Sequence, residues 1–298
     1  MSLLEQTKNL CNVYDIKPAR SKGQNFLIKE AVYDKIVEVS DLQKDDLVIE
    51  VGPGLGFLTA KLAQAAQKVV AIELDDKLAA ILKTALVSQG VENVEVLNKN
   101  VLDLFFSEKS KQEQLKYKIV ANLPYNITSV FLRKFLSEEQ AKPELMVLML
   151  QKEVAERIIA KPGEMSLLAF SVQYYADAEI IQNVPAEDFW PAPKVDSAII
   201  RVRLKNHSSR RPPFLVKKEI KSSPLKGTEG LNFEKNLFRL VKFGFSSKRK
   251  MLKNNLAGGY HLNQAEAAER IKKTGFDEKV RAQELSVDDW IRLLQYFN

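Results

Sequence analysis

The fold is decided by the stretch Glu50-Val51-Gly52-Pro53-Gly54-Leu55-Gly56. It overlaps the short apolar run Val48–Val51, which predicts a buried strand, and is followed by a helical pattern over Thr59–Ala66. Glycines in a strand-to-helix turn allow a sharp bend and the close approach of a ligand to the backbone. The spacing is G-x-G-x-G, not the G-x-G-x-x-G typical of nicotinamide-binding folds. We therefore predict that Gly52 and Gly54 contact a nucleoside-bearing cofactor; a purely structural turn is the alternative.

Strand and helix patterns alternate after this turn, which predicts a parallel sheet covered by helices on both faces. Two later apolar runs, Glu179–Val184 and Ser197–Leu204, are expected to form the antiparallel edge of the same sheet. The further predicted strands are Val69–Glu73, Val94–Leu97, Ile119–Ala121 and Met146–Leu150. The further predicted helices are Lys77–Ser88, with Asp75 as its N-cap, Ser129–Leu136, Val154–Ala160 and Leu167–Tyr175.

The composition of the chain changes at His207. Residues 207–230 are rich in Ser, Pro and Lys and have no apolar periodicity, which predicts a long loop or linker. Only helical patterns follow, over Asn232–Phe243, Lys248–Ala257, Asn263–Thr274 and Val287–Tyr296. We therefore predict a catalytic α/β domain over residues 1–206, a basic linker over 207–230 and a small all-helical, RNA-binding domain over 231–298.

With 298 residues, 45% of them hydrophobic and 28% charged, the chain has the composition of a globular protein. Its longest apolar runs, such as Leu145–Leu150, are too short to cross a bilayer, and its beginning does not resemble a secretion signal. The lone Cys11 fits a reducing cytoplasm, and one Cys with two His cannot form a zinc site of the usual type. We expect a cytoplasmic monomer with no membrane partner and no metal.

The net charge of +7 is unevenly distributed along the chain. Between Arg201 and Lys253 there are 16 Lys or Arg against 3 Glu, which leaves the other 245 residues with a balance of −6. A solvated surface is the ordinary explanation of a basic run. A block this lopsided, beside an acidic body, favours a face that binds a polyanion, and nucleic acid is the natural partner.

The tetrapeptide Asn122-Leu123-Pro124-Tyr125 offers what the methylation of an amino group on a flat base requires. The exocyclic nitrogen of adenine is a poor nucleophile because its lone pair is delocalised into the ring. The side-chain carbonyl of Asn122 and the backbone carbonyl of Leu123 can accept hydrogen bonds from the two N–H groups of the adenine amine. They can thereby stabilise the positive charge that develops on nitrogen during attack. Pro124 stiffens the turn, and Tyr125 offers a face for stacking, worth about 1–3 kcal/mol. An ordinary turn after a strand is the alternative.

Two more positions complete the predicted site. Glu73 ends the second strand, where a carboxylate can accept both ribose hydroxyls of a nucleoside; a simple surface carboxylate is the alternative. Phe189 precedes two prolines that hold its segment extended, and could cover the other face of the target base in a sandwich with Tyr125. Together these residues indicate transfer of a methyl group from S-adenosylmethionine to adenine N6.

With these residues assembled, the chain closely resembles the KsgA family of small-subunit ribosomal RNA adenine dimethyltransferases, from about Pro18 onward. The catalytic motifs are shared with the erythromycin-resistance methylases, which modify large-subunit RNA. The segment Phe245–Leu256 looks like the basic helix signature of the KsgA family and favours that side. The other matching segments are Gly23–Leu27, Glu50–Thr59, Glu73–Asp75, Asn122–Ile127, Leu150–Val154, Phe189–Ala198 and Arg281–Ser286.

The resemblance implies an α/β, Rossmann-like S-adenosylmethionine-dependent methyltransferase fold with a small all-helical C-terminal domain. It also implies two adjacent adenosines as substrate, in a hairpin loop near the 3′ end of small-subunit RNA, each dimethylated during ribosome biogenesis. The implied cofactor pocket is lined by Gln24, Asn25, Leu27, Gly52, Gly54, Glu73, Asn100 and Asn122. The residues expected to contact RNA phosphates are Lys248, Arg249, Lys250 and Lys253.

Two features depart from the family pattern: the segment His207–Gly230 is longer than the family leads us to expect, and one residue differs. The family usually has Asp where this chain has Asn100, to accept a hydrogen bond from the adenine amino group of the cofactor. An amide oxygen still accepts that bond but lacks the charge, so weaker cofactor binding is expected. Two rival functions stay open. One is methylation of large-subunit RNA. The other is a non-catalytic ribosome-assembly factor or nucleic-acid binder with the same fold, which only Asn100 supports and which the intact Asn122–Tyr125 opposes.

Overall fold

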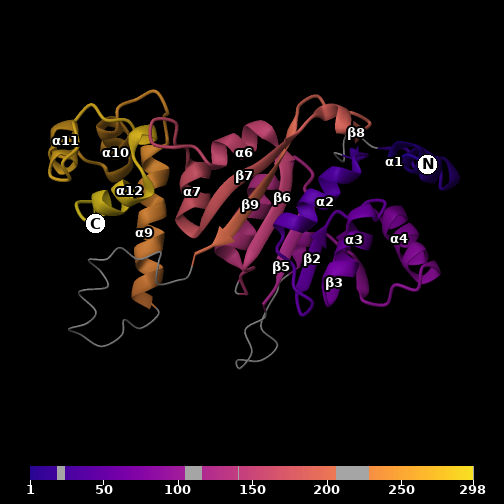
Figure 1. Ribbon diagram of the computed structural model, residues 1–298. Coiled ribbons are helices and arrows are strands. Elements are labelled where there is room, and N and C mark those ends of the chain that lie inside the picture. Colours follow the sequence, from indigo (N-terminus) through magenta and orange to yellow (C-terminus); the bar gives the residue numbers. More distant parts are fainter. Residues whose placement is uncertain (19–23, 105–115, 140, 206–227, 298) are drawn as a thin grey trace. The chain divides into compact units, whose positions relative to one another are not determined.

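The computed structural model describes residues 1–18, 24–104, 116–139, 141–205 and 228–297, and the chain forms two compact units (Figure 1). The first unit comprises Met1–Glu156 and Ala176–Leu204, and the second comprises Arg157–Tyr175 and Lys205–Asn298. The predicted linker over residues 207–230 lies almost entirely outside the described residues. The sequence-based boundaries differ from this division at Arg157–Tyr175, which we expected in the catalytic domain and which groups instead with the C-terminal helices.

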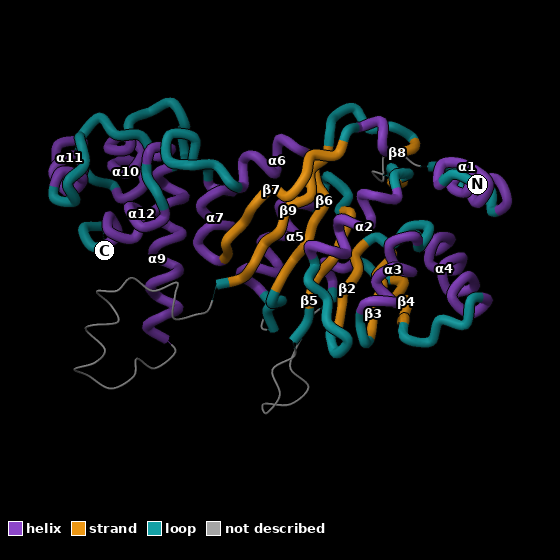
Figure 2. Tube along the Cα trace, in the orientation of Figure 1, coloured by secondary structure: helices purple, strands orange, loops and turns teal. Residues whose placement is uncertain are grey.

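A seven-stranded sheet forms the centre of the first unit, with the strand order β4-β3-β2-β5-β6-β9-β7 (Figure 2). The first five of these strands are parallel, β9 is antiparallel to β6, and β7 is antiparallel to β9. The predicted parallel sheet with an antiparallel edge is therefore confirmed. The strands are β2 (Leu47–Val51), β3 (Lys68–Glu73), β4 (Val94–Asn98), β5 (Lys118–Asn122), β6 (Leu145–Gln151), β7 (Ala176–Val184) and β9 (Ser197–Leu204).

The helices of the first unit pack on this sheet and build its core. Residues of α2 and α3, including Ile36 and Leu62, share one buried cluster with Val48 and Val120. Residues of α4, including Leu82, pack with β3 and β4 in a second cluster. The helical elements are α1 (Leu3–Val13), α2 (Glu30–Val39), α3 (Phe57–Ala65), α4 (Asp76–Ser88), η2 (Val101–Asp103), α5 (Thr128–Arg133), η3 (Lys134–Glu138), α6 (Lys152–Ile158) and η4 (Ala186–Asp188).

Local capping explains where several helices begin. Asp75 caps α4 as predicted, because its side chain accepts hydrogen bonds from the backbone N–H groups of Lys77 and Leu78. Helix α1 was not predicted, although Ser2 and Glu5 form a capping box that the sequence displays. The predicted helix Ser129–Leu136 is shorter than expected: α5 ends at Arg133 and continues as a π-helix turn.

A small two-stranded ribbon was also missed. Strand β1 (Phe26–Leu27) pairs antiparallel with β8 (Phe189–Trp190), so that Phe26 faces Trp190 and Leu27 faces Phe189. A pairing this short and this far apart in sequence leaves no periodic signal. The ribbon joins the Gln24–Leu27 motif to the proline-rich segment that precedes β9.

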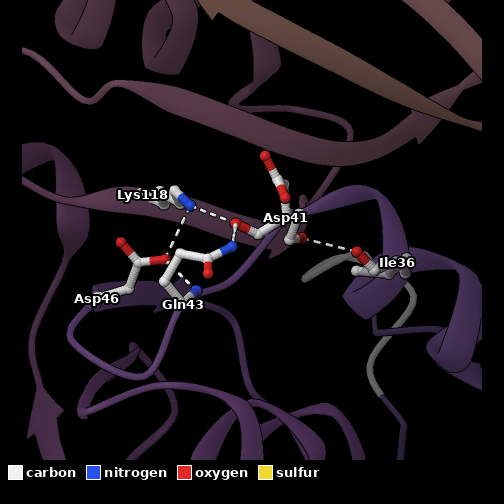
Figure 3. Close-up of polar contacts among 6 residues, drawn as sticks. Ile36, Asp41, Gln43, Asp46 and Lys118 are labelled. Carbon is white, nitrogen blue, oxygen red and sulfur yellow. Dashed lines mark hydrogen bonds and ion pairs between the residues drawn. The ribbon is translucent and has the colours of Figure 1, made fainter.

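The amino end of β5 is fixed by a mostly buried ion pair (Figure 3). Lys118 donates to the Asp46 carboxylate at 2.8 Å and to the Asp41 backbone carbonyl at 2.5 Å. The backbone N–H of Gln43 donates to the same carboxylate at 2.6 Å. Because a buried charge is costly unless it is paired and hydrogen-bonded, this network holds the loop before β2 against β5. It therefore fixes the strand whose other end carries Asn122.

The second unit is helical. Its elements are α7 (Leu167–Tyr175), α9 (Thr228–Gly244), α10 (Leu252–Tyr260), α11 (Gln264–Lys272), η6 (Ala282–Glu284) and α12 (Val287–Leu294). Aromatic side chains form its core: the ring of Phe170 meets those of Phe238 and Trp290 edge to face. These contacts from α7 explain why residues 157–175 belong to this unit. Within the residues that the structure describes, no helix is both long and apolar enough to cross a bilayer.

The start of α10 differs from the prediction. We expected a helix from Lys248, but α10 begins at Leu252, and Lys248-Arg249-Lys250 form an exposed turn before it. The buried amide of Asn255 donates to the backbone carbonyls of Gly244 and Ser247, at 2.6 and 2.9 Å. This side chain satisfies carbonyls that a continuing helix would have used, and so fixes the turn. We call Lys248-Arg249-Lys250 the basic turn.

Candidate active site

A cavity of about 300 Å³ lies in the first unit, where the parallel strands end. It is lined by residues that follow or end four neighbouring strands: Asn100 after β4, Glu73 of β3, Gly52 after β2 and Asn122 of β5. After β2 the chain forms β3 and β4 on one side of β2, and it then crosses to form β5 on the other side of β2. Ligands bind at such a switch point in open α/β sheets. The parallel topology thus brings these predicted residues together.

The glycine turn lines this cavity with Gly52, Pro53 and Gly54. Gly52 and Gly54 both have left-handed backbones, with φ of +70° and +58°. A Cβ at Gly54 would lie 3.4 Å from the ring of Phe26, and one at Gly52 would lie 3.6 Å from the backbone oxygen of Asn122. Both positions therefore need glycine for their conformation, and its small size keeps the backbone open to a ligand.

Glu73 is 7% exposed and both of its carboxyl oxygens are held by the backbone. One oxygen accepts from the N–H of Gly54 at 3.1 Å and the other from the N–H of Asp75 at 2.9 Å. Burial raises the pKa of Glu73, and the two backbone bonds oppose this rise. Each oxygen retains a second lone pair, which suits it to accept the hydroxyls of a ribose.

Glu50 is the site residue that our sequence reasoning missed. Its carboxyl group is buried, lines the cavity and has no hydrogen bond on either oxygen within the described residues. Burial raises the pKa of Glu50 to about 8, and the nearby charge of Glu73 adds to the rise. The hydroxyl of Thr59 lies near enough to lower this pKa, but without a well-formed hydrogen bond. A charged residue inside an apolar strand was the available signal.

The remaining predicted cofactor residues surround the same space. Gln24, Asn25 and Leu27 line the cavity, and Gln24 Nε2 donates to Asp75 at 3.4 Å. Asn100 Oδ1 caps η2 by accepting the backbone N–H of Leu102 at 3.0 Å. This oxygen keeps one lone pair for a ligand, so the departure from Asp leaves an acceptor in place.

The Asn122–Tyr125 turn follows β5 at the edge of the cavity. Asn122 and Pro124 line the cavity, whereas the side chain of Leu123 is buried and its N–H donates to Met149 O at 3.0 Å. Tyr125 is partly buried, and its hydroxyl lies 2.9 Å from Ser197 Oγ at the start of β9. Burial raises the pKa of Tyr125, so the phenol stays neutral. The ring is thus held beside the turn that presents Asn122.

Phe189 lies differently from what we expected. Its side chain is 3% exposed and belongs to the same core cluster as Leu27 and Val184. It is not among the residues that line the cavity. In this arrangement Phe189 cannot cover a base, so its expected sandwich with Tyr125 stays a prediction that requires the β1–β8 ribbon to move.

The expected RNA contacts lie in the second unit. All three residues of the basic turn are exposed. Lys253 differs from them, because it lies in the first turn of α10, 3.5 Å from Glu278, with a side chain only 20% exposed. Among the described residues, the three exposed cations of the basic turn have no ion-pair partner, whereas Lys253 beside them is partly buried and partly neutralised by Glu278.

Comparison with known proteins decides the family. Residues 17–213 match the profile of the family described as "Ribosomal RNA adenine dimethylase". The chain belongs to this family. Such a dimethylase transfers methyl groups from S-adenosylmethionine to rRNA adenine. The match covers the glycine turn, Glu73, Asn122–Tyr125 and Phe189, so all of the predicted catalytic residues lie within it.

Relatives of the dimethylase match over nearly their whole length. "Ribosomal RNA small subunit methyltransferase A" of Dehalococcoides mccartyi (strain CBDB1) is 39% identical, over 99% of this chain and 94% of its own. The protein of the same name from Desulfitobacterium hafniense (strain DSM 10664 / DCB-2) is 41% identical, over 92% and 90%. The second unit is thus shared as well as the first.

Two solved structures resemble this dimethylase over both units. A dimethyladenosine transferase from Plasmodium falciparum superposes with a TM-score of 0.71 at 26% identity, covering 92% of this chain and 97% of its own. The 23S rRNA methyltransferase ErmE superposes with a TM-score of 0.66 at 26% identity, covering 92% and 99%. The Rossmann-like methyltransferase fold with a helical C-terminal region is therefore confirmed.

The cavity fits the cofactor of the family. A glycine turn lines the cavity, the fixed carboxylate of Glu73 offers acceptors for a ribose, and the buried carboxyl of Glu50 lines the same space without a hydrogen-bond partner among the described residues. S-adenosylmethionine supplies a methyl group on a positively charged sulfur. The residues that would hold it are those of the glycine turn together with Glu73 and Asn100.

Proposed function

We propose that the protein dimethylates N6 of two adjacent adenosines in the 3′-terminal hairpin loop of small-subunit ribosomal RNA. The observation that carries this proposal is the pairing of a nucleoside cavity with the Asn122–Tyr125 turn at one edge of the sheet. The choice of the small subunit is supported by the names of relatives that match over nearly the whole chain. The basic segment Phe245–Leu256 supports the same choice.

Asn122 and Leu123 carry the proposed chemistry. The carboxamide oxygen of Asn122 and the backbone carbonyl of Leu123 accept hydrogen bonds from the two N–H groups of the target amine. These hydrogen bonds draw the nitrogen toward tetrahedral geometry. They stabilise the positive charge that develops on that nitrogen as it attacks the methyl group. No strong base is required, because the proton becomes acidic once the nitrogen carries the methyl. Positioning thus accounts for most of the rate.

Labelled methyl groups test the choice of substrate. The protein is incubated with methyl-labelled S-adenosylmethionine and either immature small subunits or large subunits. We expect label in small-subunit RNA alone. Label in large-subunit RNA alone would assign the protein to the rival methylases. If neither RNA is labelled while calorimetry shows cofactor binding, the non-catalytic assembly factor would be favoured.

Ser197 is expected to position the stacking ring. Ser197→Ala removes the 2.9 Å bond to the Tyr125 hydroxyl, worth about 1 kcal/mol, and frees the ring to move. We predict that kcat falls by about fivefold to tenfold with little change in the KM for cofactor. Steady-state kinetics measure this, with Ser137→Ala, an exposed serine, as the matched control. A variant with unchanged kcat would show that Tyr125 does not depend on this bond.

The basic turn is expected to bind RNA phosphates. Replacing Lys248, Arg249 and Lys250 by Gln should weaken RNA binding and lower the slope of log K against log salt by about 2–3. Filter binding over a range of salt concentrations measures the slope. The matched control replaces three exposed lysines of the first unit, Lys8, Lys44 and Lys83. Equal slopes in wild type and variant would show that the basic turn does not contact RNA phosphates.

We further propose that the protein acts as a monomer in the cytoplasm, on the immature small subunit. The lone buried Cys11, which fits a reducing compartment, supports the location. Sedimentation equilibrium tests the oligomeric state, and a mass of two chains would contradict it. Recovery of the protein with mature subunits, and not with immature ones, would contradict the proposed stage.

A further inference from the structure

Glu50 is a buried acid that nothing in the described protein neutralises. The side chain is 1% exposed and both carboxyl oxygens lack hydrogen-bond partners. An ionised carboxylate without partners is very costly inside a protein, so such a group takes up a proton instead. Burial accordingly raises the pKa of Glu50 to about 8. In the ligand-free protein at neutral pH, this carboxyl is therefore mainly protonated.

The described groups that interact with Glu50 carry no positive charge. Tyr33 faces it from α2, with its hydroxyl donating to the backbone oxygen of Leu27 at 3.0 Å, and Thr59 faces it from α3. Glu73 faces it from β3 and repels a charge on it. Among the described residues that line the cavity, Lys99 is the one with a cationic side chain, and it is exposed. Within the part of the chain that the structure describes, no side chain neutralises Glu50, and a positively charged ligand in the cavity would do so.

The order of the strands indicates which part of the cofactor reaches Glu50. Along the edge of the sheet the positions run from β4 through β3 and β2 to β5. S-adenosylmethionine has a matching linear order of adenine, ribose, and then sulfur with its amino acid. With the ribose at Glu73 and the methyl group directed to Asn122, the part between them lies over β2. That part carries both positive charges of the molecule, on the sulfur and on the amino group.

We propose that Glu50 gives up its proton when the positively charged half of the cofactor enters the cavity, so that cofactor binding releases a proton. The proton passes to the solvent, and the carboxylate that remains is neutralised by the bound cation. The affinity for S-adenosylmethionine then rises with pH at the lower end of the physiological range. This inference depends on the cofactor and not on which RNA is methylated.

Calorimetry in two buffers tests the proposal. Binding of S-adenosylmethionine to the full chain is measured at pH 6 and pH 7, in phosphate and in imidazole, whose different ionisation enthalpies reveal protons that are released. At these pH values the amino group of the ligand stays charged. We expect nearly one proton released per ligand bound, and an affinity about tenfold higher at pH 7 than at pH 6. A heat that is equal in both buffers would overturn the proposal.

Two other ligands show which positive charge of the cofactor neutralises the Glu50 carboxylate. 5′-Methylthioadenosine keeps the adenine and ribose but has neither charge, and it should bind without proton release. S-adenosylhomocysteine keeps the amino group and loses the charge on sulfur. Release with this ligand assigns the effect to the ammonium, and no release assigns it to the sulfonium; both support the proposal. Proton release with 5′-methylthioadenosine would contradict it.

The variant Glu50→Gln identifies the residue. It keeps the shape and neutrality of the protonated acid, so it should fold and bind the cofactor without releasing a proton, at an affinity that does not change between pH 6 and pH 7. Release that persists in this variant would assign the proton to Glu73 and overturn the proposal. If the variant binds too weakly to measure, the wild-type comparison still decides whether a proton is released. A wild-type protein that binds no cofactor would instead contradict the family's activity, which is a separate failure.

Discussion

Asn122→Ala should lower the rate of methyl transfer to adenosine by about 10²–10³-fold or more while the protein stays folded. The alanine removes the amide oxygen that accepts an N–H of the target amine. One of the two acceptors is then lost, and the positive charge that develops on nitrogen is stabilised only by the Leu123 carbonyl. Single-turnover kinetics with bound RNA measure the chemical step directly, so that a change in RNA affinity does not obscure the result.

Conservative and distant variants sharpen this prediction. Asn122→Asp keeps an acceptor oxygen and should retain part of the activity, so the order of rates is Asn, then Asp, then Ala. Asn183→Ala removes an exposed amide from β7 and serves as the matched control. If Asn122→Ala and wild type transfer methyl groups at similar rates, the two-acceptor mechanism is wrong.

Glu50→Gln should make the ligand-free protein more stable at pH 8 than the wild type, by up to about 3–5 kcal/mol. The pKa of Glu50 is about 8 in the folded protein against 4.5 for an ordinary glutamate. Between these values the unfolded chain has lost the proton that the folded protein still binds. Stability therefore falls as pH rises through this window, and levels off above it. Glutamine cannot ionise and does not show this fall.

Urea unfolding at a series of pH values, without cofactor, measures this difference. Wild type and Glu50→Gln should be equally stable near pH 4.5 and diverge toward pH 8. Glu92→Gln, which changes an exposed carboxyl, is the control and should follow the wild type. Parallel curves for wild type and Glu50→Gln would show that the buried carboxyl is not held neutral. A Glu50→Gln variant more stable than the wild type would mean that Glu50 destabilises the ligand-free protein and is kept for binding the cofactor.

Much of the fold could be predicted because its signals are local. The apolar run before Gly52 predicts β2, and Asp75 caps the following helix where its sequence places it. Parallel strands have their carboxyl ends at one edge, so the sequence also predicts that Gly52, Glu73 and Asn122 come together. These three residues do line one cavity.

What escaped prediction depends on contacts between distant segments. Asn255 fixes the basic turn by bonding carbonyls up to eleven residues away, and its sequence context shows only a helical pattern. Phe170 packs against Phe238 and Trp290. Residues 157–175 therefore belong to the second unit and not to the catalytic domain in which the sequence placed them. The isolation of Glu50 is likewise a property of the packed core: the sequence shows the acid but not the absence of its partners.

Mass mapping of small-subunit RNA, after a short incubation with the protein and S-adenosylmethionine, locates the methyl groups. We expect two neighbouring adenosines in the 3′-terminal hairpin loop, each carrying two methyl groups on N6, and a yield lower by about 10²-fold or more with Asn122→Ala over the same time. Methyl groups on another base or another atom, or the same yield of dimethyladenosines with Asn122→Ala, would show that the proposed reaction is wrong.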